Sequence, residues 1–286
     1  GLEVRRKEVS GIVRGHLEES PDTVLETVVR VLHVVPFHAC LKCRCRVSAL
    51  MGVRRSDYPW RFKSLPFTSK TSLPTEAHSS MLRGYPALAI LCLALFLSDP
   101  VQRFVIAPWV RLFPSSRIRV LTRWQRLMAH LCLGMVGRVG GARFPQLPRI
   151  PGRAGTLVVM NHQSLMDIPI VVASIQGSYP RIVTRKRYHR WIPLISHMVR
   201  LYQYPVVDPR ANTGGTRKML GSLAEAARES DVPLAIFPEG TRTKDGEIGR
   251  FKTNGLKQIL SQRPWTVYVM VGDGYWQRAK FKHFLR

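Results

Sequence analysis

The chain has 286 residues, with 44 Lys and Arg against 18 Asp and Glu, which gives a formal net charge of +26. So large a positive surplus predicts an anionic partner, either nucleic acid, a membrane surface or a phosphorylated substrate. The five cysteines, three of them crowded at Cys40, Cys43 and Cys45, provide no disulfide framework of a small secreted domain. They favour a reducing, cytosol-facing compartment, and their spacing lacks the second ligand pair of a zinc site, so we expect no metal.

Residues 1–80 are predicted to form a weakly ordered N-terminal extension. Short apolar groups give way, from residue 56 onward, to a stretch rich in Pro, Ser, Thr and Lys that has neither a helical nor a strand period. The composition and hydrophobic pattern change at Met81, which could be the natural start of a shorter protein. The extension is therefore not expected to contribute to the catalytic fold.

Residues 81–138 are predicted to form a membrane-associating helical segment. The uncharged run from Tyr85 to Leu97 has thirteen residues, fewer than the roughly 20 needed to cross a bilayer. It predicts a re-entrant or interfacial helix, with a core helix or a signal-peptide segment as alternatives. Between Arg117 and Arg138, apolar and basic residues each recur at steps of three and four, which predicts an amphipathic helix. We favour contact of its apolar stripe with an anionic membrane over packing on a domain; the stripe comprises Leu121, Trp124, Met128, Leu131 and Met135.

Residues 139–286 are predicted to form a catalytic domain of the α/β class. Apolar stretches typical of strands lie at 156–160, 182–183, 205–207, 232–237 and 266–271, and helical patterns lie at 190–201, 214–229 and 249–261. This alternation predicts a mixed, largely parallel sheet flanked by helices. Binding and catalytic groups in such sheets follow the carboxyl ends of the strands.

The strand at 156–160 ends directly on Asn161 and His162, and Asp167 follows five residues after the histidine. Residues five apart in an unbroken helix point about 140° apart. The two side chains therefore meet only if His162 lies in the turn before a helix that begins near Ser164. In that geometry Asp167 orients the imidazole, and His162 acts as a general base. A hydrogen-bonded structural histidine is the alternative for this pair taken alone.

The strand at 232–237 also ends on polar groups, in the sequence Pro238 to Arg242. Gly240 permits close approach of the backbone, Thr241 offers a hydroxyl group, and Arg242 offers a planar fork that matches phosphate oxygens. Taken alone, this stretch is compatible with a simple turn carrying a solvated arginine. Two such strand ends at one edge of a sheet predict a base beside an anion-binding group.

The two motifs, Asn161-His162 with Asp167 and then Phe237 to Arg242, together resemble the glycerolipid acyltransferase family, specifically its 1-acyl-glycerol-3-phosphate acyltransferases. The resemblance covers roughly residues 85–275. It implies transfer of a fatty acyl group from acyl-CoA or acyl carrier protein to the hydroxyl of a lysophospholipid, without a bound cofactor or metal. It also implies an enzyme on the cytoplasmic face of an anionic membrane. The implied catalytic residues are His162 and Asp167. The implied substrate-binding residues are Asn161, Lys186, Glu239, Gly240, Thr241 and Arg242. Of these, Lys186 and Arg242 would bind the phosphate, and Glu239 would bind the glycerol hydroxyls or neighbouring basic groups.

The sequence also departs from the pattern of the family. Ser196 and Gln203 stand where glycines are usual, and Pro209 stands where an arginine is common. The acceptor could therefore be another lysolipid. Two further alternatives are a catalytically inactive lipid-binding relative and a basic nucleic-acid-binding protein. We expect no nucleic-acid partner, because no recognition fold is visible and the apolar run at 85–97 would have no role in one.

Overall fold

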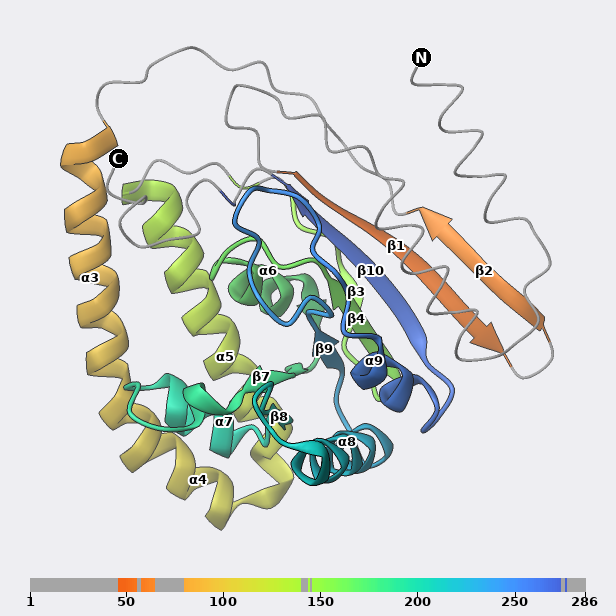
Figure 1. Cartoon of the computed structure of the whole chain (residues 1–286). Helices are drawn as coiled ribbons and strands as arrows, with labels where there is room; N and C mark the ends of the chain where they lie inside the picture. The colour runs from red at the N-terminus through yellow and green to blue at the C-terminus, as the bar shows by residue number, and fades with distance from the viewer. Residues whose placement is uncertain are drawn as a thin grey trace, which may run out of the picture.

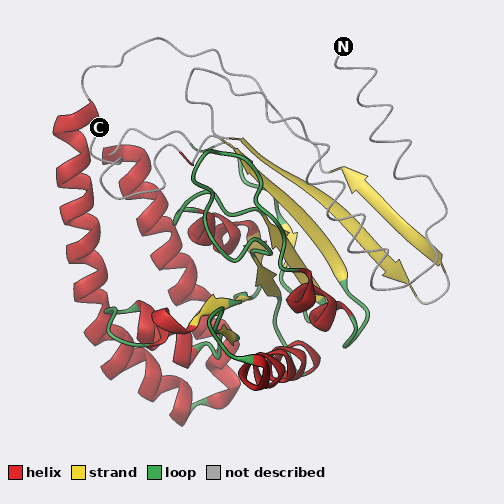
Figure 2. Ribbon diagram, viewed as in Figure 1, coloured by secondary structure: helices red, strands yellow, loops and turns green. Residues whose placement is uncertain are grey.

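The structure is a computed structural model, and it describes residues 46–55, 58–64, 80–139, 144, 146–273 and 276. The cysteine cluster at 40–45 and the remainder of the predicted extension lie outside these residues. Within them, strands and helices alternate from residue 150 onward, as the sequence predicts (Figures 1 and 2). The predicted domain boundaries at 80 and 138 remain predictions.

The main sheet has six strands in the order β2-β1-β10-β4-β9-β6. Its members are β1 (Arg46–Arg55), β2 (Tyr58–Ser64), β4 (Thr156–Met160), β6 (Arg181–Ile182), β9 (Leu234–Ile236) and β10 (Thr266–Asp273). The last four in the order, β10, β4, β9 and β6, are mutually parallel, whereas β1 runs antiparallel to both β10 and β2. The predicted α/β class with a mixed, largely parallel sheet is confirmed.

The strands β1 and β2 lie within the segment for which the sequence predicted little order, and the prediction is wrong for these residues. β1 pairs with β10 over a long register, from Arg46 opposite Asp273 to Val53 opposite Thr266. The hairpin thus closes one edge of the parallel sheet (Figure 1). The pairing partner is more than two hundred residues away along the chain, so no local pattern could reveal it.

Two small sheets lie outside the main one. β3 (Ile150–Pro151) pairs with β5 (Ile175–Gln176), and β7 (Thr184–Arg185) pairs with β8 (Val206–Val207). The strand predicted at 205–207 therefore exists, but it belongs to a two-stranded sheet instead of the main sheet. This small sheet carries Arg185 and Lys186 toward the candidate site.

Helices cover both faces of the main sheet, and the alternation of β4 shows why. Leu157 and Val159 point into a core shared with α8 (Thr213–Arg228) and α9 (Thr253–Leu260), whereas Val158 and Met160 point into a core shared with α5 (Arg117–Gly134) and α6 (Asp167–Ser174). All four side chains are at most 1% exposed. A strand buried on both faces is typical of a parallel sheet between two helical layers.

Two helices begin later than predicted. α7 (Ile195–Leu201) replaces the predicted helix at 190–201, and α9 replaces the one at 249–261. Trp191 and Leu194 have positive φ angles of 70° and 59°, which lie outside the helical region, and Pro193 stands between them. The segment before α7 is therefore an irregular, strained loop.

The apolar run at 85–97 belongs to a much longer helical rod. α3 (Ser80–Val101) continues through a π-helical turn, η1 (Gln102–Ile106), into α4 (Ala107–Leu112). Residues Ala89–Leu112 are long and apolar enough to cross a membrane by length and composition alone, with a mean hydropathy of 1.7 and only 6% of the stretch buried. The sequence prediction that the helix is too short is wrong, because the helix does not stop at its first polar residues. Asp99 pairs with Arg103 one turn later at 2.6 Å, and Gln102 is fully buried, with its amide donating to the carbonyl of Leu194 at 3.2 Å.

The predicted role of the amphipathic helix also needs correction. On α5, Leu121 and Met128 are buried in a core that includes Tyr202, whose hydroxyl donates a hydrogen bond to the carbonyl of Leu121 at 2.9 Å. The apolar stripe therefore packs on the α/β part of the fold and does not face a membrane. An apolar stripe on a helix predicts that the stripe is buried, but it does not identify what covers it. Large exposed apolar side chains are instead concentrated on α3, η1 and α4, among them Leu93, Phe96, Phe104, Val105 and Leu112.

Candidate active site

His162 and Asp167 meet at the carboxyl end of β4. His162 lies in the turn after the strand, Asp167 is the first residue of α6, and Nδ1 of the imidazole is 2.7 Å from Oδ2 of the carboxylate. The same oxygen accepts the backbone N–H groups of Gln163 and Ser164 at 2.7 and 2.8 Å. The chain folds back as the sequence analysis required, although the helix begins at Asp167 and not near Ser164.

The pair combines a buried acid with a partly exposed imidazole. Asp167 is fully buried, whereas the His162 side chain is 15% exposed and its ring stacks on Phe237 at 4.4 Å. Because Nδ1 faces a carboxylate, it carries the proton of the neutral ring and Nε2 keeps its lone pair. Within the described residues, no side chain or backbone group hydrogen bonds to Nε2. This nitrogen is thus the one that can accept a proton from a reacting group.

Glu239 connects the two sequence motifs through the backbone. Its Oε1 accepts the N–H of His162 at 2.8 Å, its Oε2 accepts the N–H of Gly249 at 3.0 Å, and its side chain is buried. Burial raises the pKa of the Glu239 carboxyl, and the two backbone donors and His162 oppose that rise. Each oxygen already accepts one backbone N–H group, and the side chain is only 3% exposed. In this position Glu239 holds the turn that carries His162.

This arrangement explains why a glycine stands at position 249. A Cβ atom at Gly249 would lie 3.1 Å from Oε2 of Glu239. A larger residue would therefore push the carboxylate away from the backbone of the 240–252 loop. The same loop is tied to the catalytic turn a second time, because the N–H of Thr243 donates to the carbonyl of His162 at 2.8 Å.

Asn161 joins β4 to the end of β10 and does not line an open site. Its amide donates to the carbonyl of Gly272 at 2.9 Å and accepts the N–H of the same residue at 2.8 Å, and its side chain is 1% exposed. The predicted substrate-binding role of Asn161 is therefore not supported by its position. The residue fixes the spacing of two neighbouring strand ends.

We expect Asn161→Asp to destabilise the fold while leaving the chemistry of His162 in place. An aspartate can accept the N–H of Gly272 but cannot donate to its carbonyl, which leaves two buried oxygens facing each other. The expected loss is about 1–3 kcal/mol in the free energy of unfolding, measured by denaturant titration. Asn212→Asp, at the exposed cap of α8, is the control, because an aspartate there still accepts the N–H of Gly215. Equal stability of the two variants would contradict the prediction.

Three of the remaining predicted residues, Gly240, Thr241 and Arg242, are consecutive in the turn after β9. Gly240 has φ of +63°, and its carbonyl accepts Nε of Arg185 at 2.7 Å as well as a second nitrogen of the same guanidinium group. A Cβ atom at Gly240 would lie 3.3–3.5 Å from the Lys252 side chain. Thr241 is exposed and Arg242 is half-buried. The structure thus gathers basic side chains around this turn.

Arg185 and Lys252 were not among the predicted site residues. Lys186, which was, lies on a short 3-10 turn, η4 (Lys186–His189), with its side chain 73% exposed and its ammonium group 3.2 Å from Asp208. The only signal for Arg185 in the sequence is its position beside Lys186 in a basic run. Its long reach to the backbone of Gly240, 55 residues further on, is visible only in the folded chain.

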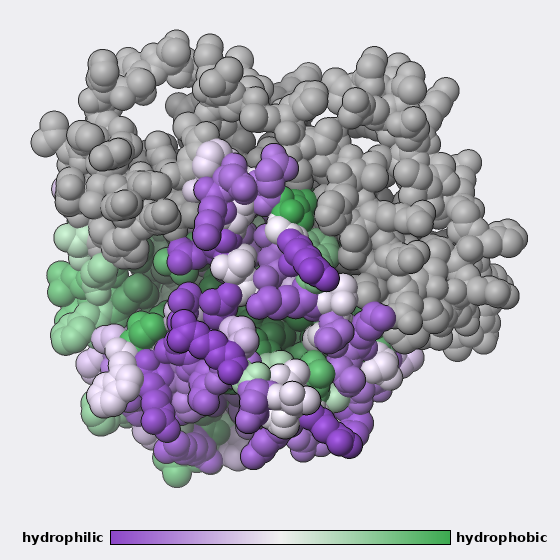
Figure 3. All heavy atoms as spheres, in the orientation of Figure 1, coloured by the Kyte–Doolittle hydropathy of each residue, from purple (hydrophilic) through white to green (hydrophobic). Residues whose placement is uncertain are grey.

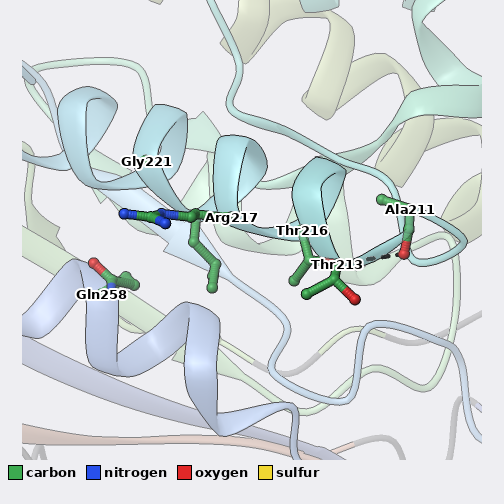
Figure 4. Close-up of a pocket in the computed structure, with 7 residues that line it drawn as sticks. Ala211, Thr213, Thr216, Arg217, Gly221 and Gln258 are labelled. Carbon is green, nitrogen blue, oxygen red and sulfur yellow. Dashed lines mark hydrogen bonds between the residues drawn. The ribbon is translucent and has the colours of Figure 1, made fainter.

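A cavity of about 710 Å³ lies elsewhere, between α8 and α9. Figure 4 shows Arg217 on α8 lying across from Gln258 on α9, with Thr213 and Thr216 at the start of α8. None of the predicted site residues lines this cavity. Within the described residues, no group of three His, Cys, Asp or Glu side chains is placed to hold a metal ion.

Comparison with known proteins matches residues 142–271 to the family model described as Acyltransferase. A 1-acyl-sn-glycerol-3-phosphate acyltransferase from Cocos nucifera is 25% identical over 59% of this chain and 51% of its own length. The enzyme of the same name from Helicobacter pylori strain J99 is 32% identical over 40% of this chain and 47% of its own length. The chain therefore spans about half the length of these two relatives. The crystal structure of the 1-acyl-sn-glycerophosphate (LPA) acyltransferase PlsC from Thermotoga maritima aligns with 66% of this chain and 85% of its own, with 17% identity and a TM-score of 0.42.

Proposed function

We propose that the protein, whose residues 142–271 match the Acyltransferase family model, transfers a fatty acyl group from acyl-CoA or acyl carrier protein to the free hydroxyl of a lysophospholipid. The acceptor proposed is 1-acyl-glycerol-3-phosphate and the product phosphatidic acid. The curated relatives carry this activity in their names. The observation that carries the proposal is the buried Asp167 carboxylate holding Nδ1 of His162 at 2.7 Å at a strand end.

The proposed reaction needs one base and no covalent intermediate on the enzyme. Nε2 of His162 takes the proton of the acceptor hydroxyl as its oxygen attacks the carbonyl carbon of the thioester. Asp167 keeps the ring oriented and stabilises the imidazolium that forms. The tetrahedral intermediate then collapses, the carbon–sulfur bond breaks, and the leaving thiolate takes the proton from the imidazolium. The acyl ester and a free thiol are the products.

The basic groups near Gly240 provide a proposed site for the acceptor's phosphate. Arg242 can present a planar fork to two phosphate oxygens, and Lys186 adds a point charge. The ion pair of Lys186 with Asp208 is solvent-exposed and therefore weak. A phosphate group carrying about two negative charges can displace that single carboxylate. Gly240 and Thr241 line the same turn.

The proposed location is the cytoplasmic face of an anionic membrane. The helix from Ala89 to Leu112 exposes apolar side chains along its length, and the net charge of +26 attracts anionic lipid. A lysophospholipid acceptor resides in such a membrane. We propose no bound cofactor, metal or nucleic acid for the reaction.

Acyl transfer in mixed micelles tests the proposal. The assay pairs labelled acyl-CoA or acyl-ACP with lysophosphatidate, and in parallel with lysophosphatidylethanolamine. We expect phosphatidic acid to form from lysophosphatidate and at least one donor, because a cationic turn favours an acceptor with a terminal phosphate. A protein that prefers the ethanolamine lipid is still an acyltransferase, but its acceptor is misassigned. No transfer with any pair would contradict the proposed function.

A further inference from the structure

The loop at residues 186–192, here called the Trp191 loop, presents an aromatic side chain to solvent. Trp191 is 95% exposed and has a positive φ of 70°. This backbone conformation is unfavourable for a bulky residue and persists only where the surroundings impose it. The neighbouring Ile192 is also exposed, at 36%. An exposed apolar pair on a strained loop indicates a surface that is buried when it contacts a partner.

Hydrogen bonds fix the Trp191 loop in place. The N–H of Ile192 donates to Oγ of Ser196 at 2.9 Å, and Arg200 donates to the carbonyl of His189 at 2.8 Å. Directly after the loop, Leu194 is buried, with 1% of its surface exposed. The exposure of Trp191 is thus a fixed feature of the fold.

Leu194, two residues after the Trp191 loop, anchors the chain there to the apolar helical rod. Oδ1 of Asp99 accepts the N–H of Leu194 at 2.6 Å, and Nε2 of Gln102 donates to the carbonyl of Leu194 at 3.2 Å. Asp99 and Gln102 both lie within the stretch that is long and apolar enough to cross a membrane. Figure 1 shows α7 beside the lower part of α3 and α4, and Figure 3 shows hydrophobic residues at the edge formed by α3 next to a strongly hydrophilic face. The Trp191 loop therefore lies near any surface that the rod contacts.

The charge of the Trp191 loop defines the chemistry of that surface. Lys186, Arg187 and Arg190 are exposed. Lys186 pairs with Asp208, but neither Arg187 nor Arg190 forms an ion pair with any other described residue. Arg187 lies 4.7 Å above the ring of Tyr188. Tryptophan flanked by arginine is the combination favoured at the head-group level of an anionic bilayer.

We propose that the Trp191 loop is a second membrane contact, in which Trp191 inserts among the lipids of an anionic leaflet and Arg187 and Arg190 bind their phosphates. The inference rests on the membrane association in the proposed function, but not on acyl transfer. Arg185, immediately before the loop, donates to the carbonyl of Gly240. The loop therefore fixes the candidate site at the depth of the lipid head groups, where a lysophospholipid is available.

Site-specific fluorescence tests this contact in the full-length chain. The five cysteines are replaced by serine, Trp191→Cys is labelled with an environment-sensitive fluorophore, and the protein is mixed with phosphatidylcholine vesicles with or without about 30 mol% phosphatidylglycerol. We expect emission to rise severalfold and shift to the blue with the anionic vesicles. Ser261→Cys is the matched control, because Ser261 is exposed at the end of α9, before the amino end of β10, and the site lies at the carboxyl ends of the parallel strands. Adding Arg187→Gln and Arg190→Gln should raise the phosphatidylglycerol needed for half the response by about five-fold or more.

The outcomes separate this inference from the proposed function. An equal response at positions 191 and 261, or no response at 191 to the anionic vesicles, would overturn the loop contact whether or not the protein is an acyltransferase. If the serine replacements prevent folding, quenching by brominated phospholipids is measured with the native cysteines. The quenched fraction of tryptophan emission should then fall in Trp191→Ala. An unchanged fraction would contradict the proposal.

Discussion

Replacing His162 with alanine is expected to lower kcat for acyl transfer by about 10²- to 10⁴-fold, the usual contribution of a positioned general base. The fold should survive, because Oδ2 of Asp167 keeps two backbone donors, the N–H groups of Gln163 and Ser164. The measurement is the initial rate with lysophosphatidate, together with the thermal unfolding midpoint of each variant.

His130→Ala is the matched control for this experiment. His130 is exposed on α5, and its loss should leave the rate unchanged. If His162→Ala retained a rate within about three-fold of the parent, transition-state stabilisation by the imidazole would be worth less than 1 kcal/mol. His162 would then be a structural residue and the proposed mechanism would be wrong.

Two substitutions at Asp167 are expected to separate orientation of the histidine from its electrostatic support. Asparagine can place its oxygen where Oδ2 accepts three N–H groups and its amino group where Oδ1 lies. Oδ1 is buried and has no hydrogen-bond partner among the described residues. Asp167→Asn should therefore keep the fold but lower kcat by about 10²- to 10⁴-fold, because the negative charge that stabilises the imidazolium is lost.

Asp167→Ala is expected to damage both stability and activity. Removing the carboxylate leaves three donors without their acceptor, two of them backbone groups in a buried turn. A loss of about 3 kcal/mol or more in the free energy of unfolding follows from leaving such groups unpaired. Denaturant titration and the rate with lysophosphatidate check both variants. An asparagine variant with full activity would show that the negative charge of Asp167 is not needed and that this residue only shapes the turn.

The two strand-end motifs could be located from the sequence because their signals are local. An apolar strand followed at once by Asn161 and His162 is visible within a few residues, and the strand at β4 was predicted with its observed bounds. The pairing of His162 with Asp167 required only that the intervening turn fold back. Family resemblance then joined this motif to the one at Phe237 to Arg242.

The roles of several residues inside those motifs could not be predicted, because they depend on partners far away in the chain. The carboxylate of Glu239 and the amide of Asn161 can hydrogen bond to a substrate as readily as to the protein backbone. Glu239 is separated from the backbone of His162 by 77 residues, and Asn161 is separated from Gly272 by 111. In the folded chain both are buried and engaged with the backbone, so they support the site from within.

The apolar helices between residues 81 and 138 divide in the same way. Hydropathy identified apolar helical material between residues 81 and 138, because the periodicity of side chains is a property of neighbouring residues. Which of these surfaces remains exposed was decided by packing. The stripe on α5 is covered by the α/β part of the fold. The rod from α3 to α4 keeps large apolar side chains exposed, while its polar residues Asp99 and Gln102 hydrogen bond to the backbone of Leu194.

The sequence by itself thus determined the α/β class, the two strand ends that carry the motifs and the pairing of a histidine with an acid. Only the tertiary structure decided that the β1–β2 hairpin closes the sheet, that Arg185 reaches Gly240, and that Trp191 is held outward beside the apolar rod. The physical reason is the range of the interactions. Periodicity and turn chemistry act between neighbours, whereas burial and hydrogen-bond partners are set by segments that meet only when the chain folds.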